Sequence, residues 1–418
     1  PRWLRPSFTL RDSTILNISY YYLHTYTDMY SIIFNMSTLV FSHINALRAL
    51  RRERRIHSAV AWDTLSAADA RLALDTCIPN KSQLDMAYFD RLGLVDESDF
   101  RPPHLLVASP ASRRPSKPRS VIAHVHTGNL PRGAIQCIEH DLYTVSPAFA
   151  ALQYSLDHSY EATFMLLMEL LGTYTLPEEA TFPIADGEPW SPEDQTSSAS
   201  NKNARSDDTD GQPETQDSQR AVPVEQVRYG CEPATTIADL QTLSAWARSS
   251  KYASFRKAVR HVKAGSASPM ESIMYGVFGL PLSHGGFACN SLPGGGMLLN
   301  KRIVFNSQAV TMASGIPYAT CDAYIPTAKT ALEYNGEYHE TARATLHDAK
   351  RNNGLKGMGV SVIVVTREQL YDIPALEAIA MSIYRAAGRR FRYRFDGYRE
   401  RQQNLLNGLR MGTGLPLV

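Results

Sequence analysis

A long polar stretch over residues 185–227 constrains the fold more than any other feature of the chain. It includes the run SPEDQTSSASNKNARSDDTDGQPETQDSQR and has almost no large apolar side chain. Such a segment cannot bury enough apolar surface to offset the entropy that it would lose on ordering. We therefore predict a disordered acidic linker between an N-terminal part, residues 1–184, and a C-terminal part, residues 228–418.

Composition narrows the class of protein. The chain has 418 residues, of which 44% are hydrophobic and 20% charged, as in soluble globular proteins. Its 43 Lys and Arg nearly balance its 41 Asp and Glu, so net charge alone indicates no nucleic-acid partner. Five Cys without a CxxC pair argue against a disulfide framework or a zinc ribbon and favour a cytoplasmic location. Polar residues interrupt the apolar stretch 15–41, which fits neither a transmembrane helix nor a signal peptide.

The hydrophobic periodicity predicts an α/β fold in both parts of the chain. In the N-terminal part, we expect a mixed α/β module with helices over 41–52, 149–154 and 161–171 and strands over 105–108 and 121–126. In the C-terminal part, we expect helices over 238–247, 251–262, 341–356 and 373–387, and strands over 303–305, 318–324, 330–334 and 360–365. Ser268 and Pro269 indicate the start of another helix. The continuous apolar run VSVIVV at 360–365 is typical of a buried central strand.

Acidic residues in the C-terminal part predict a metal site. Asp322 lies near the end of one predicted strand and Glu333 lies on the next, so a hairpin would bring the two carboxylates together. Glu271 lies in the first turn of the helix that begins after Ser268. Carboxylate oxygens suit a hard divalent cation, Mg²⁺ or Mn²⁺. Each residue also has a simpler interpretation, because Asp322 fits a turn and Glu271 suits a helix N-terminus.

The order of these residues resembles the PD-(D/E)xK nuclease superfamily, and within it the Vsr-like endonucleases of very short patch repair. That branch has a helix acid, a strand Asp, a strand ending in E-x-(D/K)-G-x-x-H, a helix with D-x-x-R, and a Gly before an apolar strand. The matching residues are Glu271, Asp322, Glu333, Gly336, His339, Asp348, Arg351 and Gly359. The resemblance implies a restriction-endonuclease-like mixed sheet flanked by helices, with Asp322, Glu333 and Glu271 as metal ligands and His339 assisting proton transfer.

One position departs from this pattern. Asn335 stands where the family has Lys or Asp, and a neutral amide can only hydrogen-bond. Asn335 would then position a water molecule, or the site would have lost its activity. The sequence therefore leaves three functions open. The chain could be a metal-dependent DNA endonuclease, a non-catalytic DNA-binding regulator that keeps the nuclease fold as a scaffold, or a protein-interaction module that acts on a partner toxin without contacting DNA. Asp348 and Arg351 would brace the site, contact phosphate, or form only a surface pair.

The N-terminal part resembles the module of AbiEi-like antitoxins. The runs that carry this resemblance are FSHINALRAL, VIAHVHTGNLP, YTVSPAFAALQYS and MELLGTY. It implies a role in phage defence or toxin–antitoxin control, with DNA and a toxin as partners. His124 and His126 alternate on a predicted strand, where we expect a core or surface role rather than a metal site.

Basic clusters indicate where DNA would bind. One spans the end of the first predicted helix and includes Arg48, Arg51, Arg52, Arg54 and Arg55. A second lies in the loop 113–119. Near the C-terminus, Arg389, Arg390, Arg392 and Arg394 interleave with aromatic residues, which fits a strand with one basic and one aromatic face. Together with Arg351 and Lys356, these four arginines are the predicted nucleic-acid contacts. The alternative is that the aromatic residues are core and the arginines merely solvated.

Overall fold

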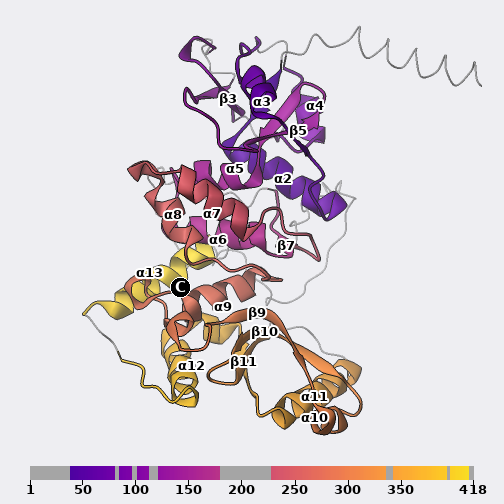
Figure 1. Ribbon diagram of the computed structural model, residues 1–418, viewed down its shortest axis with the longest axis vertical. Coiled ribbons are helices and arrows are strands. Elements are labelled where there is room, and N and C mark those ends of the chain that lie inside the picture. The colour runs from indigo at the N-terminus through magenta and orange to yellow at the C-terminus, as the bar shows by residue number, and fades with distance from the viewer. Residues whose placement is uncertain are drawn as a thin grey trace, which may run out of the picture.

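The computed structural model describes residues 38–80, 84–96, 101–112, 121–178, 227–335, 342–392 and 396–413 (Figure 1). It has the predicted mixed α/β fold, with two mixed sheets flanked by helices. Residues 185–226 of the predicted linker lie outside the described residues, so the division into two domains stays a prediction. All five cysteines are free. None of the described helices is both long and apolar enough to cross a membrane.

A six-stranded sheet forms the first layer of the N-terminal part, with strand order β2-β5-β6-β1-β3-β4. Strand β1 pairs in parallel with β6 and antiparallel with β3, and β3 pairs in parallel with β4. The strands are β1 (Leu39–Phe41), β2 (Asp63–Thr64), β3 (His104–Val107), β4 (Ile122–Val125), β5 (Ile135–Glu139) and β6 (Leu142–Val145). The helices here are α2 (His43–His57), α3 (Ala67–Leu74), α4 (Met86–Arg91), α5 (Pro147–Tyr154) and α6 (Tyr160–Leu171).

Helix α6 is the centre of the packing between the two parts. Its sequence is apolar on all sides, which is typical of a buried helix, and residues 162–171 are all buried. It contacts α5 on one side and, from the C-terminal part, α8 (Ala253–Val259), α9 (Pro269–Gly279) and α13 (Tyr398–Met411). A short pairing of β7 (Tyr174–Thr175) with β8 (Arg228–Tyr229) adds a further connection.

Two buried arginines secure this junction. Arg51 forms a two-pronged ion pair with Glu169 of α6, with nitrogen–oxygen distances of 2.8 and 3.0 Å. Arg54 is 1% exposed and donates to the carbonyl oxygens of Glu169, Gly172 and Glu232. The interpretation of this arginine cluster as a DNA contact is therefore wrong for Arg51 and Arg54. Arginines at half-buried positions of a helix cannot be told from surface arginines by spacing alone.

The second sheet positions the predicted metal site. Its order is β12-β11-β10-β9, from β9 (Leu298–Val304), β10 (Tyr318–Ile325), β11 (Thr330–Asn335) and β12 (Ser361–Thr366). Strands β9, β10 and β11 are antiparallel, and β11 pairs in parallel with β12. One face packs against α10 (Ser307–Met312) and α11 (Ala342–Gly357) around Phe305 and Leu355. The other face joins the main core through residues such as Ala323 and Leu332.

Two predictions about strands are wrong. The run 360–365 was expected to be a central strand, but β12 is at the edge of its sheet and Val364 is 45% exposed. An apolar run indicates a strand without showing how many neighbours that strand has. Residues 389–392 form no strand, although Phe391 packs on Phe287, Tyr384 and Tyr398 while the neighbouring arginines are exposed. The remaining helices are α7 (Ile237–Trp246) and α12 (Ile373–Ala386).

Candidate functional site

Asp322 and Glu333 lie on neighbouring strands, as the sequence predicts. The antiparallel pairing of β10 with β11 ends at Ala323 and Leu332, and Asp322 and Glu333 are the next residues beyond this pair on the two strands. The backbone N–H of Tyr334 donates to Asp322 Oδ2 at 2.8 Å. The hairpin between β10 and β11 is short, and this local connection fixes the pairing.

Glu271 reaches the same region from the first turn of α9. Ser268 caps this helix, since its Oγ accepts the backbone N–H of Glu271 at 3.1 Å. The carboxylate of Glu271 turns back, and its Oε2 accepts from Ala267 N at 2.8 Å and from Asn300 Nδ2 at 2.6 Å. The backbone N–H of Glu271 is thus part of the helix cap, and its carboxylate faces the sheet.

Asn300 is a site residue that the sequence analysis missed. It lies in β9 with φ of 44°, a left-handed conformation that Asn tolerates better than most residues. Its side-chain amide donates to the backbone oxygen of Gly265 as well as to Glu271. The strand expected from the sequence covered only residues 303–305, whereas β9 begins at Leu298, so no local signal drew attention to Asn300.

The charge of Asp322 affects the pKa of the two other carboxyl groups, those of Glu271 and Glu333. Burial raises the pKa of Glu271 to about 7, and the charge of Asp322 adds to the effect. Burial followed by repulsion from Asp322 also raises the pKa of Glu333 to about 7, against the opposing charge of Arg351. Burial raises the pKa of Asp322 itself, while the Tyr334 N–H and Arg351 oppose this. Such a cluster is deficient in positive charge and gains from binding a cation.

The protein itself places a positive charge, that of Arg351, beside Glu333. From α11 its Nη2 donates to Glu333 Oε1 and to the backbone oxygen of Thr320, each at 2.5 Å. Of the roles considered for it, bracing the site agrees best with these contacts. The Oδ1 atom of Asp348, three residues earlier in the chain, instead lies 3.9 Å from Nδ1 of His347.

The other predicted site residues are spread more widely. Asn335 is the exposed last residue of β11, and Lys356 is exposed near the end of α11. Arg389, Arg390 and Arg392 are exposed after α12. His339 and Arg394 lie outside the described residues, as do Gly336 and the basic loop 113–119.

The three carboxylates do not form a closed set of ligands. Within the described ranges, only His43, His104 and His124 make a group of three or more His, Cys, Asp or Glu residues whose potential ligand atoms all lie within 4.8 Å of one another. In at least one pair among Glu271, Asp322 and Glu333, the potential ligand oxygens are therefore more than 4.8 Å apart. Asp322 and Glu333 are the two of these residues that neighbouring strands bring together.

A cavity of about 540 Å³ lies elsewhere, between α5 and α7. Phe149 and Trp246 line it, and none of the three carboxylates does. The candidate metal site, which combines side chains of the second sheet with Glu271 of α9, does not belong to this cavity.

Comparison of the chain with family models, curated proteins and solved structures finds no match in any of the three. The Vsr-like and AbiEi-like resemblances therefore rest on their motifs, and the residues above are judged by their geometry.

Proposed function

We propose that the C-terminal part is a metal-dependent endonuclease that hydrolyses DNA phosphodiester bonds. The observation that supports this most is the arrangement around Asp322, which lies on the strand next to that of Glu333 and whose charge acts on both Glu333 and Glu271, with the pKa of each carboxyl group raised. Oxygen ligands of this kind suit Mg²⁺ or Mn²⁺. When bound, such an ion supplies an activated water and stabilises negative charge on phosphate.

The protein residues have separate roles in this proposal. Asp322 and Glu333 bind the cation, and Glu271 of α9 is available as a third carboxylate ligand. Arg351 holds Glu333 in place through its ion pair. Asn335 would position water, and the resemblance adds His339 as the group that moves a proton.

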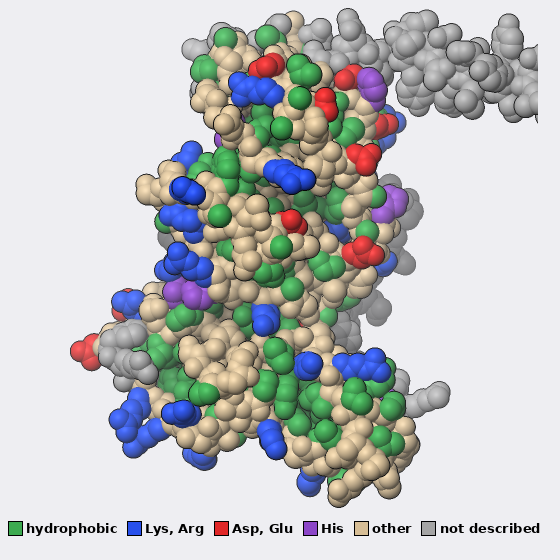
Figure 2. All heavy atoms as spheres, viewed as in Figure 1, with side chains coloured by type: hydrophobic (Ala, Val, Ile, Leu, Met, Phe, Trp, Pro, Cys, Tyr) green, Lys and Arg blue, Asp and Glu red, His purple; other side chains and the backbone are tan. Residues whose placement is uncertain are grey.

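The charge distribution is consistent with a DNA partner. Figure 2 shows Lys and Arg side chains over the whole of this face, and in its lower part, around the second sheet and its helices, few Asp or Glu side chains lie among them. Arg389, Arg390, Arg392 and Lys356 are exposed and would contact the phosphate backbone. The proposal places the protein in the cytoplasm, in phage defence or toxin–antitoxin control, with a toxin as a further partner.

The test is a plasmid nicking assay with Mg²⁺ or Mn²⁺. Wild type is expected to convert supercoiled plasmid, while Asp322→Asn and Glu333→Gln are inactive. Glu400→Gln, which changes an exposed acid in α13, is the matched control and retains wild-type cleavage. Equal cleavage by wild type and the two site variants would reject the nuclease.

Asn335 favours a second function, a DNA-binding regulator without catalysis. In that case, calorimetry shows no Mg²⁺ or Mn²⁺ binding, but DNA binding persists and weakens steeply with salt. Replacing Asn335 by Lys would test the same point, since a gain of cleavage would indicate a site that lacks only this residue.

A further inference from the structure

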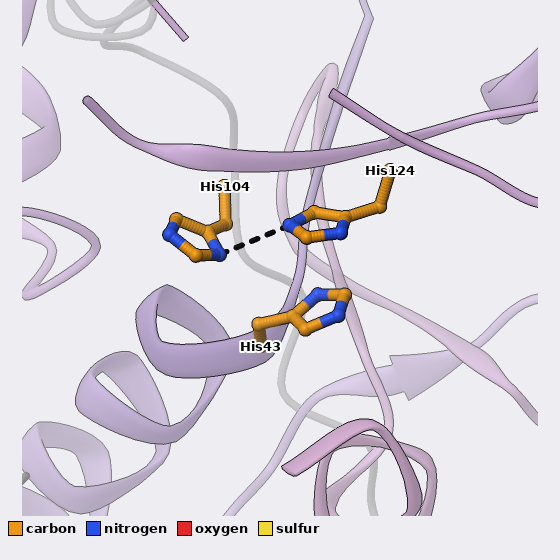
Figure 3. A group of neighbouring side chains, drawn as sticks. All are labelled: His43, His104 and His124. Atoms are coloured by element: carbon orange, nitrogen blue, oxygen red, sulfur yellow. Dashed lines mark hydrogen bonds between the residues drawn. The ribbon is translucent and has the colours of Figure 1, made fainter. Parts of the chain in front are cut away.

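Three histidines from separate elements meet in the N-terminal part (Figure 3). His43 begins α2, His104 begins β3 and His124 lies in β4. His124 Nε2 and His104 Nδ1 share a hydrogen bond of 3.0 Å, and the rings of His43 and His124 stack with centroids 3.5 Å apart. One nitrogen from each ring lies within 4.8 Å of the other two.

The surroundings of the trio favour neutral imidazoles. Burial, followed by the proximity of His124 and His104, lowers the pKa of His43 to about 2. Burial also lowers the pKa of His104, with Asp157 opposing this and Arg101 adding to it. Ring nitrogens that stay unprotonated keep a lone pair available, which is the form of histidine that binds metals.

A second layer of contacts holds two of these residues in position. Ser42 Oγ is hydrogen-bonded to His43 Nδ1 at 3.0 Å, which leaves Nε2 of that ring for another partner. Gln153 Oε1 accepts the backbone N–H of His43 at 3.1 Å, and Asn45 Oδ1 accepts that of His104 at 2.8 Å. Metal-binding histidines in proteins are oriented by this kind of outer contact.

The backbone of His43 adds an independent observation. Its φ of 52° lies in the left-handed region, where non-glycine residues pay a conformational cost. This conformation occurs at the junction between β1 and α2, and it turns the His43 ring toward the two strand histidines (Figure 3). Residues kept in such conformations often serve a function.

We propose that His43, His104 and His124 form a zinc site with three histidine ligands and one position open to water. In tetrahedral coordination with Zn–N near 2.0–2.1 Å, two ligand nitrogens lie about 3.3 Å apart. The 3.0 Å hydrogen bond between His104 and His124 needs to lengthen only slightly, while the His43 ring rotates off its stack. Imidazole ligands select a borderline ion such as Zn²⁺, whereas the carboxylates of the second sheet select Mg²⁺. The zinc site therefore does not depend on the proposed nuclease.

The test uses the full chain, dialysed against EDTA and titrated with ZnSO₄ by calorimetry. Wild type is expected to bind one Zn²⁺ through the trio, and Co²⁺ in its place is expected to give the intense visible absorption of a tetrahedral site. His124→Phe, which keeps a ring on the stack, and His104→Ala are expected to lose affinity by about a hundredfold or more, since even outer contacts affect affinity by 10–100-fold. His126→Ala is the matched control, because His126 lies one residue beyond β4 and stacks on Trp246 outside the trio. This variant is expected to bind Zn²⁺ as wild type does.

Two results would overturn the zinc site. One is the absence of Zn²⁺ binding at micromolar concentration by folded wild type together with a cobalt spectrum that lacks tetrahedral bands. The other is unchanged Zn²⁺ affinity in both His124→Phe and His104→Ala, which would place any bound ion elsewhere. Circular dichroism of each variant separates lost binding from lost folding, and the wild-type cobalt spectrum tests the site without any variant. Running the titration on Asp322→Asn keeps this result distinct from the proposed nuclease, since its histidine site is intact.

Discussion

Glu271→Gln should make the metal-free protein more stable at alkaline pH. Glu271 is 7% exposed, and its Oε2 accepts hydrogen bonds from Ala267 and Asn300. A glutamine has nearly the same shape, and its amide oxygen can accept both bonds without a charge. The substitution therefore removes the buried charge and leaves the local hydrogen bonding in place.

The size of the effect follows from the pKa of this carboxyl group. Burial raises the pKa of Glu271 from its ordinary value of 4.5 to about 7 in the folded protein. The folded state thus holds a proton more tightly than the unfolded chain, so stability is full below pH 4.5 and is lost as pH rises through 7. At 1.36 kcal/mol per pKa unit, the loss is about 3 kcal/mol. Gln at position 271 does not ionise and avoids this loss.

Urea unfolding followed by circular dichroism, in EDTA at pH values from 4.5 to 8.5, measures this difference. We expect Glu271→Gln to match wild type near pH 4.5 and to exceed it by up to about 3 kcal/mol at pH 8.5. Glu400→Gln, which alters an exposed acid, should follow the wild-type curve throughout. If the difference between Glu271→Gln and wild type does not change with pH, the argument from the buried charge is refuted.

Three further predictions concern other contacts. Arg351→Met removes the group that holds Glu333 in place and lowers its pKa, so that pKa, measured by pH-dependent NMR, should rise; an unchanged pKa would contradict this. Because Glu333 is then less well positioned and more protonated, Mg²⁺ titrations near pH 7 should show weaker binding. Arg51→Met leaves the buried Glu169 carboxylate without its ion-pair partner and should cost about 3–5 kcal/mol in urea unfolding, whereas the double variant with Glu169→Leu should lose less. Gly354→Ala places a methyl group against the Phe305 ring and should lower stability by about 1–3 kcal/mol in thermal unfolding.

Local sequence signals predict the part of the candidate site that lies close together in the chain. Ser268 and Pro269 mark the start of α9, and the structure has the cap that they predict. Asp322 and Glu333 are separated by one hairpin, so strand alternation and a short connection suffice to bring them together. Helix α6 was likewise predictable from its apolar sequence and the stop at Gly172.

Contacts between distant segments could not be predicted in this way. His43, His104 and His124 are brought together by the parallel pairing of β3 with β4 and by the position of α2, and no local periodicity reports such pairings. The same holds for Arg54, whose partners include Glu232 in the C-terminal part. The run 360–365 shows a related limit, since hydrophobicity indicated the strand but not its place at the sheet edge.

Burial acts in opposite directions on the two candidate metal sites, and this is why they should respond differently to pH. It lowers the pKa of His43 and His104, which leaves their nitrogens unprotonated across the neutral range. It raises the pKa of Glu271 and Glu333 to about 7, so a cation there has to displace protons before it can bind. Binding at the carboxylates should therefore strengthen as pH rises through 7 and release protons, while binding at the histidines changes little over the same range. A chain with both sites would hold an imidazole-bound ion at a pH where its carboxylates are still partly protonated.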